Sequence, residues 1–267
     1  MDLPLGWPPR PLEYPWCSSH DSCTDDERHR DGLPHPNEDR DSQAAKRLVE
    51  GTSIVSGVFD FTGAPVSVRQ DLRDAYAKIW RHLASPGPTL TAIQRIALAE
   101  FVRASAGNAV PPRTDQPEPL LHLAATLFAD PGDVDATIVT SAADAAGDPV
   151  VVEVISLVSM LSAVDGAHRA LTADPEPLPS PVAGDPTGEI SRGLTRRRTH
   201  VPMPAGAIPV ALDLLPAVGE AFRDSFGPQY MTEAEMGSDL FERSPGLNRA
   251  QIELVSTRTS LHNRCFY

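Results

Sequence analysis

Apolar residues recur at helical spacing along most of the chain, so the pattern predicts helices rather than strands. The clearest series lies within residues 67–84, where apolar side chains fall three or four positions apart: Val68, Leu72, Tyr76, Ile79 and Leu83. We expect Ser67 to cap this helix, because Gln70 follows at the capping-box position. The Ser85-Pro86-Gly87-Pro88 stretch should end it, since proline interrupts the helical hydrogen bonds.

The same periodicity predicts further helices on both sides of a proline-rich stretch. They cover residues 90–99, 117–128, 133–146, 209–226 and 247–263, with a short helical region in 229–243. The longest follows Asp148-Pro149, which places proline at the first helical position, and covers residues 150–171. It is apolar on nearly every side, so it should lie at the centre of the fold. Aromatic residues are only 6% of the chain while alanine, leucine and valine are plentiful, which also favours an all-α fold.

Several polar residues on these predicted helices allow two interpretations. Glu153 and Asp165, on the central helix, could handle protons. They could instead be held by an arginine or a helix end, which is the favoured interpretation. Trp80 and His82 are expected on the surface of the first helix, in packing or solvent roles rather than as ligands.

Proline and charge divide the chain into four parts. Residues 1–42 combine many prolines and charges with little periodicity, which predicts a disordered tail. Residues 43–172 form an N-terminal helical half, in which 43–58 could hold a short helix. Residues 173–208 form a proline-rich linker and a basic loop, and residues 209–267 form a shorter C-terminal half. The basic run in the loop could attract an anion, but a solvated connection is the favoured interpretation: Arg192, Arg196, Arg197, Arg198 and His200.

The two halves share a helix-start pattern that suggests an internal duplication. The matching pairs lie at a constant offset of 157 residues: Leu90 with Leu247, Thr91 with Asn248 and Gln94 with Gln251. Ile96 then stands where the second copy has Glu253, and Asn108 stands roughly where it has Cys265. The first copy is therefore predicted to be structural, without a redox pair. Chance similarity between two capped helices is the alternative.

The C-terminal stretch, residues 247–267, carries the candidate chemistry. Asn248 and Gln251 make an N-x-x-Q version of the capping box. The helix should end near Asn263, because asparagine tolerates the left-handed conformation of a turn. A cysteine just past a helix end, Cys265, preceded by a carboxylate on that helix, Glu253, is a candidate redox site. An apolar stripe accompanies it: Ala250, Leu254, Val255 and Leu261.

This stretch resembles the alkylhydroperoxidase D-like family, which includes the carboxymuconolactone decarboxylases. The resemblance rests on Leu247, Gln251, Glu253, Leu254, Ser260, Asn263, Cys265 and Tyr267. In the redox-active branch a glutamate stands twelve positions before the first cysteine of a C-x-x-C motif, as Glu253 stands before Cys265. A histidine follows the second cysteine. Both would lie beyond Tyr267, so we expect the motif to be cut within the C-x-x-C and the C-terminal half to be incomplete.

The resemblance implies an alkylhydroperoxidase D-like helical bundle with thiol-dependent peroxidase activity and no cofactor. Cys265 would attack a hydroperoxide, Glu253 would act in a proton relay, and His262 could offset negative charge near the thiol. The implied partners are the hydroperoxide and a thiol or dithiol reductant, and a homo-oligomer is the usual state. We expect weak turnover in this form and an apolar stripe that lacks one packing neighbour. A decarboxylase-like lyase or a non-catalytic helical scaffold is the alternative.

Charge and cysteine usage argue against several other classes. The net charge of −13 disfavours nucleic acid as a partner, because phosphate binding needs a basic surface. The chain lacks an apolar run of the length that spans a bilayer and a basic-then-apolar start, so we expect no membrane span, no secretory signal and a cytoplasmic protein. Cys17 and Cys23 do not have zinc-ligand spacing with the nearby histidines, so no metal site is expected.

Overall fold

The computed structural model describes residues 59–196, 199–205, 210–243 and 246–265. Within these ranges the chain forms helices and two isolated β-bridges but no strand, which confirms the all-α class. The described residues belong to one compact unit, Ser53–Tyr267. The predictions of a disordered tail over 1–42 and a short helix over 43–58 fall outside the described residues.

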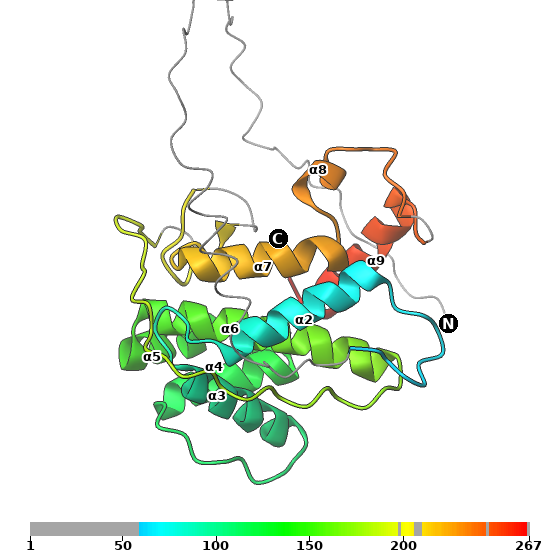
Figure 1. The fold of residues 1–267 in the computed structure, drawn as a ribbon. Coiled ribbons are helices and arrows are strands. Elements are labelled where there is room, and N and C mark those ends of the chain that lie inside the picture. Colours follow the sequence, from blue (N-terminus) through cyan, green and yellow to red (C-terminus); the bar gives the residue numbers. More distant parts are fainter. Residues whose placement is uncertain (1–58, 197–198, 206–209, 244–245, 266–267) are drawn as a thin grey trace, which may run out of the picture. The chain divides into compact units, whose positions relative to one another are not determined.

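Eight α-helices and one 3-10 helix follow in order along the described chain (Figure 1). They are α2 (Gln70–Ala84), α3 (Ala92–Ala106), α4 (Glu118–Ala129), η1 (Pro131–Asp133), α5 (Ala136–Ala146), α6 (Asp148–Ala170), α7 (Pro216–Gln229), α8 (Glu233–Met236) and α9 (Arg249–His262).

Side-chain caps explain where several of these helices begin. The capping box predicted from Asn248 and Gln251 forms at α9, and the matching pair of the first half, Thr91 and Gln94, forms one at α3. The capping prediction for the first helix is wrong, because α2 begins only at Gln70 and Arg69, which precedes it, makes no side-chain cap. The helix predicted over 209–226 begins late as well, since described residues 210–215 form turns before Pro216 opens α7.

Helix α6 is the centre of the fold, as its all-round apolar sequence predicts. It contacts α2, α3, α4, α5 and α7, and Figure 1 shows α2 and α7 side by side across it. By length and composition alone α6 could cross a membrane, but 61% of its apolar window is buried against these neighbours. It therefore has the character of a core helix.

A buried ion pair joins α6 to α3. The Glu153 side chain is 0% exposed and the Arg95 side chain is 1% exposed, and Arg95 Nε lies 3.5 Å from Glu153 Oε1. Burial lowers the pKa of Arg95, and the nearby Glu153 carboxylate opposes that shift. The expectation that Glu153 is held by an arginine is thus confirmed.

The same carboxylate also binds the loop that connects α2 to α3. Glu153 Oε2 accepts hydrogen bonds from the Thr89 backbone N–H at 2.7 Å, the Thr89 hydroxyl at 2.6 Å and the Leu90 N–H at 3.3 Å. Arg95 donates from the other side to the Ser85 carbonyl at 2.7 Å. Glycine is needed at Gly87 because a Cβ there would lie 1.8 Å from Glu153 Oε1. The loop is therefore fixed by one buried charge pair.

The proline-rich linker is extended and lies against the helices. The Val182 N–H donates to the Ala84 carbonyl at 2.8 Å, and the Thr187 N–H donates to the Gly87 carbonyl at 3.0 Å. Trp80, predicted on a helix surface, is instead 2% exposed, and its indole N–H donates to the Pro177 carbonyl at 2.8 Å. The prediction failed because this segment covers a face of α2 that local periodicity leaves outside the core.

A second ion pair anchors the same segment. Arg103 donates to both carboxylate oxygens of Asp165, at 2.9 and 2.6 Å, and to the Glu176 carbonyl at 3.0 Å. Its guanidinium also lies 5.6 Å from the centroid of the Trp80 ring. Asp165 is thus held by an arginine, as the favoured interpretation expected.

Helix α9 lies at the edge of the fold. Ile252 is its only buried residue, whereas Leu254, Val255 and Leu261 are 65%, 57% and 67% exposed. Most of the predicted apolar stripe is therefore exposed in the described structure, and the expectation that it lacks a packing neighbour stays a prediction.

Candidate functional site

Glu253, the predicted proton acceptor, lies in the second turn of α9 and is half-exposed. Its carboxylate accepts a hydrogen bond from the Tyr230 hydroxyl at 2.7 Å and pairs with Arg249 at 2.8 Å. Burial raises the pKa of Tyr230, and the hydrogen bond to Glu253 adds to that shift. Arg249 also donates to the Met236 carbonyl at 2.8 Å, so Glu253 belongs to a network that attaches α9 to the end of α7 through Tyr230 and to the end of α8 through Met236.

Cys265 is a free, exposed thiol directly after the turn that ends α9. The turn is a Schellman motif: the Cys265 N–H donates to the Ser260 carbonyl at 2.8 Å, and the Arg264 N–H donates to the Leu261 carbonyl at 3.2 Å. Arg264 takes the left-handed position with φ 52°, whereas Asn263 has φ −78°. The prediction that Asn263 makes the left-handed turn is therefore wrong by one residue.

The Arg264 side chain ties this turn to the first half of the chain. It donates to Asp130 at 3.0 Å and to Asp133 at 2.5 Å, both at η1. These two carboxylates raise the pKa of Arg264. All three groups are about half exposed, so each contact contributes little stability alone.

The structure places the three predicted site residues along α9 without direct contact. Among the described residues, no hydrogen bond or ion pair joins Glu253, exposed His262 and Cys265. His262 lies nine positions after Glu253 on a continuous helix, a rise of about 14 Å. A proton relay between Glu253 and Cys265 therefore needs intermediate groups and stays a prediction.

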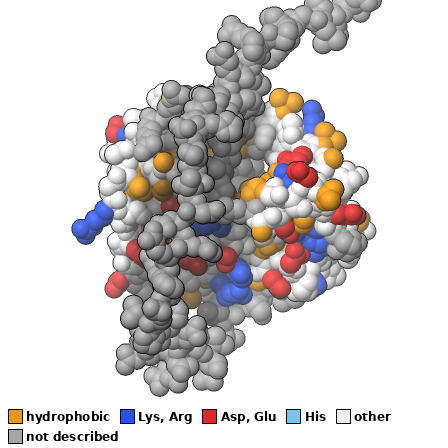
Figure 2. Space-filling view, turned by 90° about the horizontal axis from the view of Figure 1, so that it is seen from above, with side chains coloured by type: hydrophobic (Ala, Val, Ile, Leu, Met, Phe, Trp, Pro, Cys, Tyr) orange, Lys and Arg blue, Asp and Glu red, His pale blue; other side chains and the backbone are white. Residues whose placement is uncertain are grey.

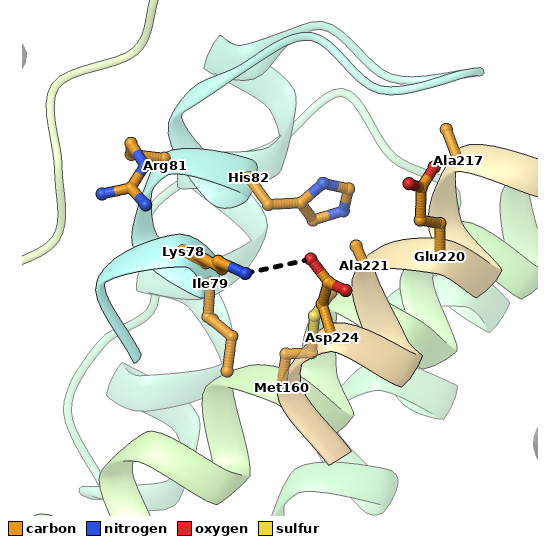
Figure 3. Close-up of a pocket in the computed structure, with 9 residues that line it drawn as sticks. All are labelled: Lys78, Ile79, Arg81, His82, Met160, Ala217, Glu220, Ala221 and Asp224. Atoms are coloured by element: carbon orange, nitrogen blue, oxygen red, sulfur yellow. Dashed lines mark hydrogen bonds and ion pairs between the residues drawn. The ribbon is translucent and has the colours of Figure 1, made fainter. Parts of the chain in front are cut away.

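A separate site, which the sequence interpretation missed, lies between α2 and α7. This α2–α7 cleft has a volume of about 290 Å³. Lys78, Arg81 and His82 lie on its α2 side, and Ile79 and Met160 form its floor (Figure 3). The α7 side consists of Ala217, Glu220, Ala221 and Asp224.

Some charged groups at the cleft form ion pairs and others do not. Figure 3 shows Lys78 reaching across to Asp224, with 3.3 Å between Nζ and Oδ2, while Arg81 points away from α7. Glu220, on the α7 side, has no hydrogen-bond or ion-pair partner among the described residues. The pairing of Lys78 with Asp224 leaves Glu220 as the uncompensated charge of the α7 side.

His82 connects this cleft to the buried ion pair. It also lines a smaller cavity of about 10 Å³ together with Arg95, and its Nε2 is enclosed without a hydrogen-bond partner. Burial, with a further contribution from the Arg95 charge, lowers the pKa of His82 to about 3. The imidazole is thus neutral near pH 7. The only sequence feature that could have indicated an enclosed His82 is its position next to apolar residues of the same helix, Ile79 and Leu83.

Charges elsewhere are interspersed. On the face seen in Figure 2, Lys and Arg side chains of the described residues are interspersed with Asp and Glu. Within the described ranges, no group of His, Cys, Asp and Glu has the arrangement of a metal site.

Comparison of the chain with protein-family models, curated protein sequences and solved structures gave no match. The assignment of a function therefore depends on the residues and their geometry.

The neutral His82 predicts a pH-dependent stability. Its folded-state pKa lies below the ordinary 6.5, so the unfolded chain binds more protons, and stability falls as the pH falls from 6.5 towards 3. The loss should approach about 1.4 kcal/mol per pH unit. Asp60 and Asp71, whose pKa values are lowered, lose their contributions only below about pH 4.

Urea unfolding of the wild type and of His82→Gln at pH 7, 6, 5 and 4 measures this effect. As the pH falls over that range, the wild type should lose stability relative to His82→Gln. The control His122→Gln changes an exposed histidine and should lose as much stability as the wild type. Parallel curves for wild type and His82→Gln would show that His82 titrates normally.

Proposed function

We propose that this chain is a thiol-dependent peroxide reductase of the alkylhydroperoxidase D type, with Cys265 as the reacting thiol. The observation that carries the proposal is the α9 segment. It combines the formed capping box, a glutamate in the second turn and a free exposed cysteine after the helix, in the order and spacing of the family's redox motif. This supports a redox function over a decarboxylase-like lyase, which uses the fold without the cysteine pair.

The proposed reaction balances with an external thiol. The Cys265 thiolate attacks one peroxide oxygen, the O–O bond breaks, and the leaving alkoxide takes a proton to become an alcohol, while the sulfur becomes a sulfenic acid. One reductant thiol condenses with the sulfenic acid, releasing water and forming a mixed disulfide. A second thiol then cleaves that disulfide, which restores Cys265 and releases the oxidised reductant. Each turnover consumes one peroxide and two thiols.

The attack requires removal of the Cys265 proton. Glu253 is the proposed acceptor, and because it is about 14 Å below the last turn of α9, the proton would travel through water or His262. The Tyr230 hydroxyl and the Arg249 guanidinium both donate hydrogen bonds to this carboxylate. They also set its orientation towards the end of α7.

The role of Cys265 predicts that Cys265→Ser reduces thiol-dependent peroxide consumption to the uncatalysed background. The hydroxyl cannot form a sulfenic acid, so the two-electron step is lost. The control is the Cys17→Ser/Cys23→Ser variant, which should keep the wild-type rate. Equal rates for the wild type and Cys265→Ser would remove the thiol mechanism and favour the lyase or scaffold alternatives.

The role of Glu253 predicts that Glu253→Gln keeps the fold but slows peroxide consumption by about 10²–10³-fold, the usual contribution of general-base help. The direct readout is the alkylation rate of Cys265 by iodoacetamide across a pH series, in a background where Cys17 and Cys23 are serine. Glu253→Gln should shift the rate–pH curve to higher pH. Superimposable curves would make Glu253 a structural residue of the α9 attachment.

A further inference from the structure

The α2–α7 cleft has the features of a small-molecule site that is independent of Cys265. Its volume of about 290 Å³ is at the lower end of ligand pockets, which suits a ligand of a few carbon atoms. Ile79 and Met160, 3% and 4% exposed, give it an apolar floor. Convergent polar groups on an apolar floor are the usual composition of a binding pocket.

Beneath the cleft lie two polar atoms without a hydrogen bond, although one of them, Arg95 Nε, faces Glu153 Oε1 at 3.5 Å. His82 Nε2 and Arg95 Nε are enclosed without hydrogen bonds, although the Arg95 side chain is only 1% exposed and lines the small cavity that adjoins the cleft. Buried polar atoms are nearly always satisfied, so such a group requires an explanation. The neutral imidazole can accept a hydrogen bond at whichever ring nitrogen lacks the proton.

The charges of the cleft select the sign of the ligand. Lys78 is paired with Asp224, and Arg81, which also lines the cleft, points away from α7 (Figure 3). Among the described residues, no cation therefore pairs with Glu220. An anionic ligand would face the Glu220 and Asp224 carboxylates. A ligand cation would pair with Glu220 and could donate to neutral His82. The net charge of −13 also favours the approach of cations.

We propose that the α2–α7 cleft binds a small organic amine, with its ammonium group on Glu220 and its apolar body on Ile79, Met160 and Ala221. A charge-assisted hydrogen bond to Glu220 would supply the specificity. The apolar floor would accept a short branched or cyclic hydrocarbon. This site holds whether or not Cys265 reduces peroxides.

The test uses three probes with one hydrocarbon body: 3-methylbutylamine, 3-methylbutanol and 3-methylbutanoate. The Met160 methyl group lies in the floor, so the full chain labelled with ¹³C at methionine methyls reports occupancy by NMR, and Met160→Leu assigns the signal. The amine should shift this signal with a Kd below about 1 mM. The alcohol should bind about tenfold more weakly, and the carboxylate should cause no shift.

Two variants separate the charge from the apolar contact. Glu220→Gln should weaken the amine about tenfold, to the level of the alcohol. The control Glu118→Gln removes the same charge from an exposed position on α4 and should leave the Kd of the amine unchanged. Ala221→Leu should fill the cleft and abolish binding of both amine and alcohol. No saturable Met160 shift with the amine, equal binding of the carboxylate, or an unchanged Kd in Glu220→Gln would each overturn the proposal.

Discussion

The arrangement of the first helices depends on one buried carboxylate. Glu153 comes from the central helix, binds three donors of the α2–α3 loop and faces Arg95 on α3. Burying two charges costs free energy that only good geometry and additional hydrogen bonds offset. Here the loop provides those bonds on one side, and the Ser85 carbonyl provides one on the other. The pair therefore specifies how α2, α3 and α6 meet.

This constraint reaches the candidate ligand site through His82. The ring lies between the cleft and Arg95, and both burial and the Arg95 charge keep it neutral. Loss of the Arg95 charge would thus remove the smaller of the two causes that lower the pKa of a residue lining the surface cleft. The α9 segment, in contrast, is attached through Tyr230, Arg249 and Arg264 on partly exposed contacts. The two sites accordingly depend on different parts of the fold.

The sequence predicted what local rules decide. Hydrophobic periodicity located the helices and the central position of α6, and the capping box at Asn248 formed as expected. Periodicity failed where distant segments decide the environment of a side chain. Trp80 is buried by the proline-rich segment, and His82 is half-buried, with its Nε2 enclosed beside the α2–α7 cleft. The partner of Glu153 could not be read from spacing, because Arg95 is brought to it only by tertiary packing. For the same reason the sequence suggested Glu253 and Cys265 but gave no distance between them.

The dependence of the fold on the buried pair is tested most directly by a double-mutant cycle. Glu153→Gln removes the charge but keeps an acceptor for the loop, and Arg95→Met removes the opposite charge with similar bulk. Each single variant should lose about 3–5 kcal/mol in urea unfolding, because it leaves an uncompensated buried charge. The double variant should be less destabilised than the sum of the single losses by about 2 kcal/mol or more. Losses that add to within about 0.5 kcal/mol would contradict the account, because they would show that Glu153 and Arg95 stabilise the fold independently.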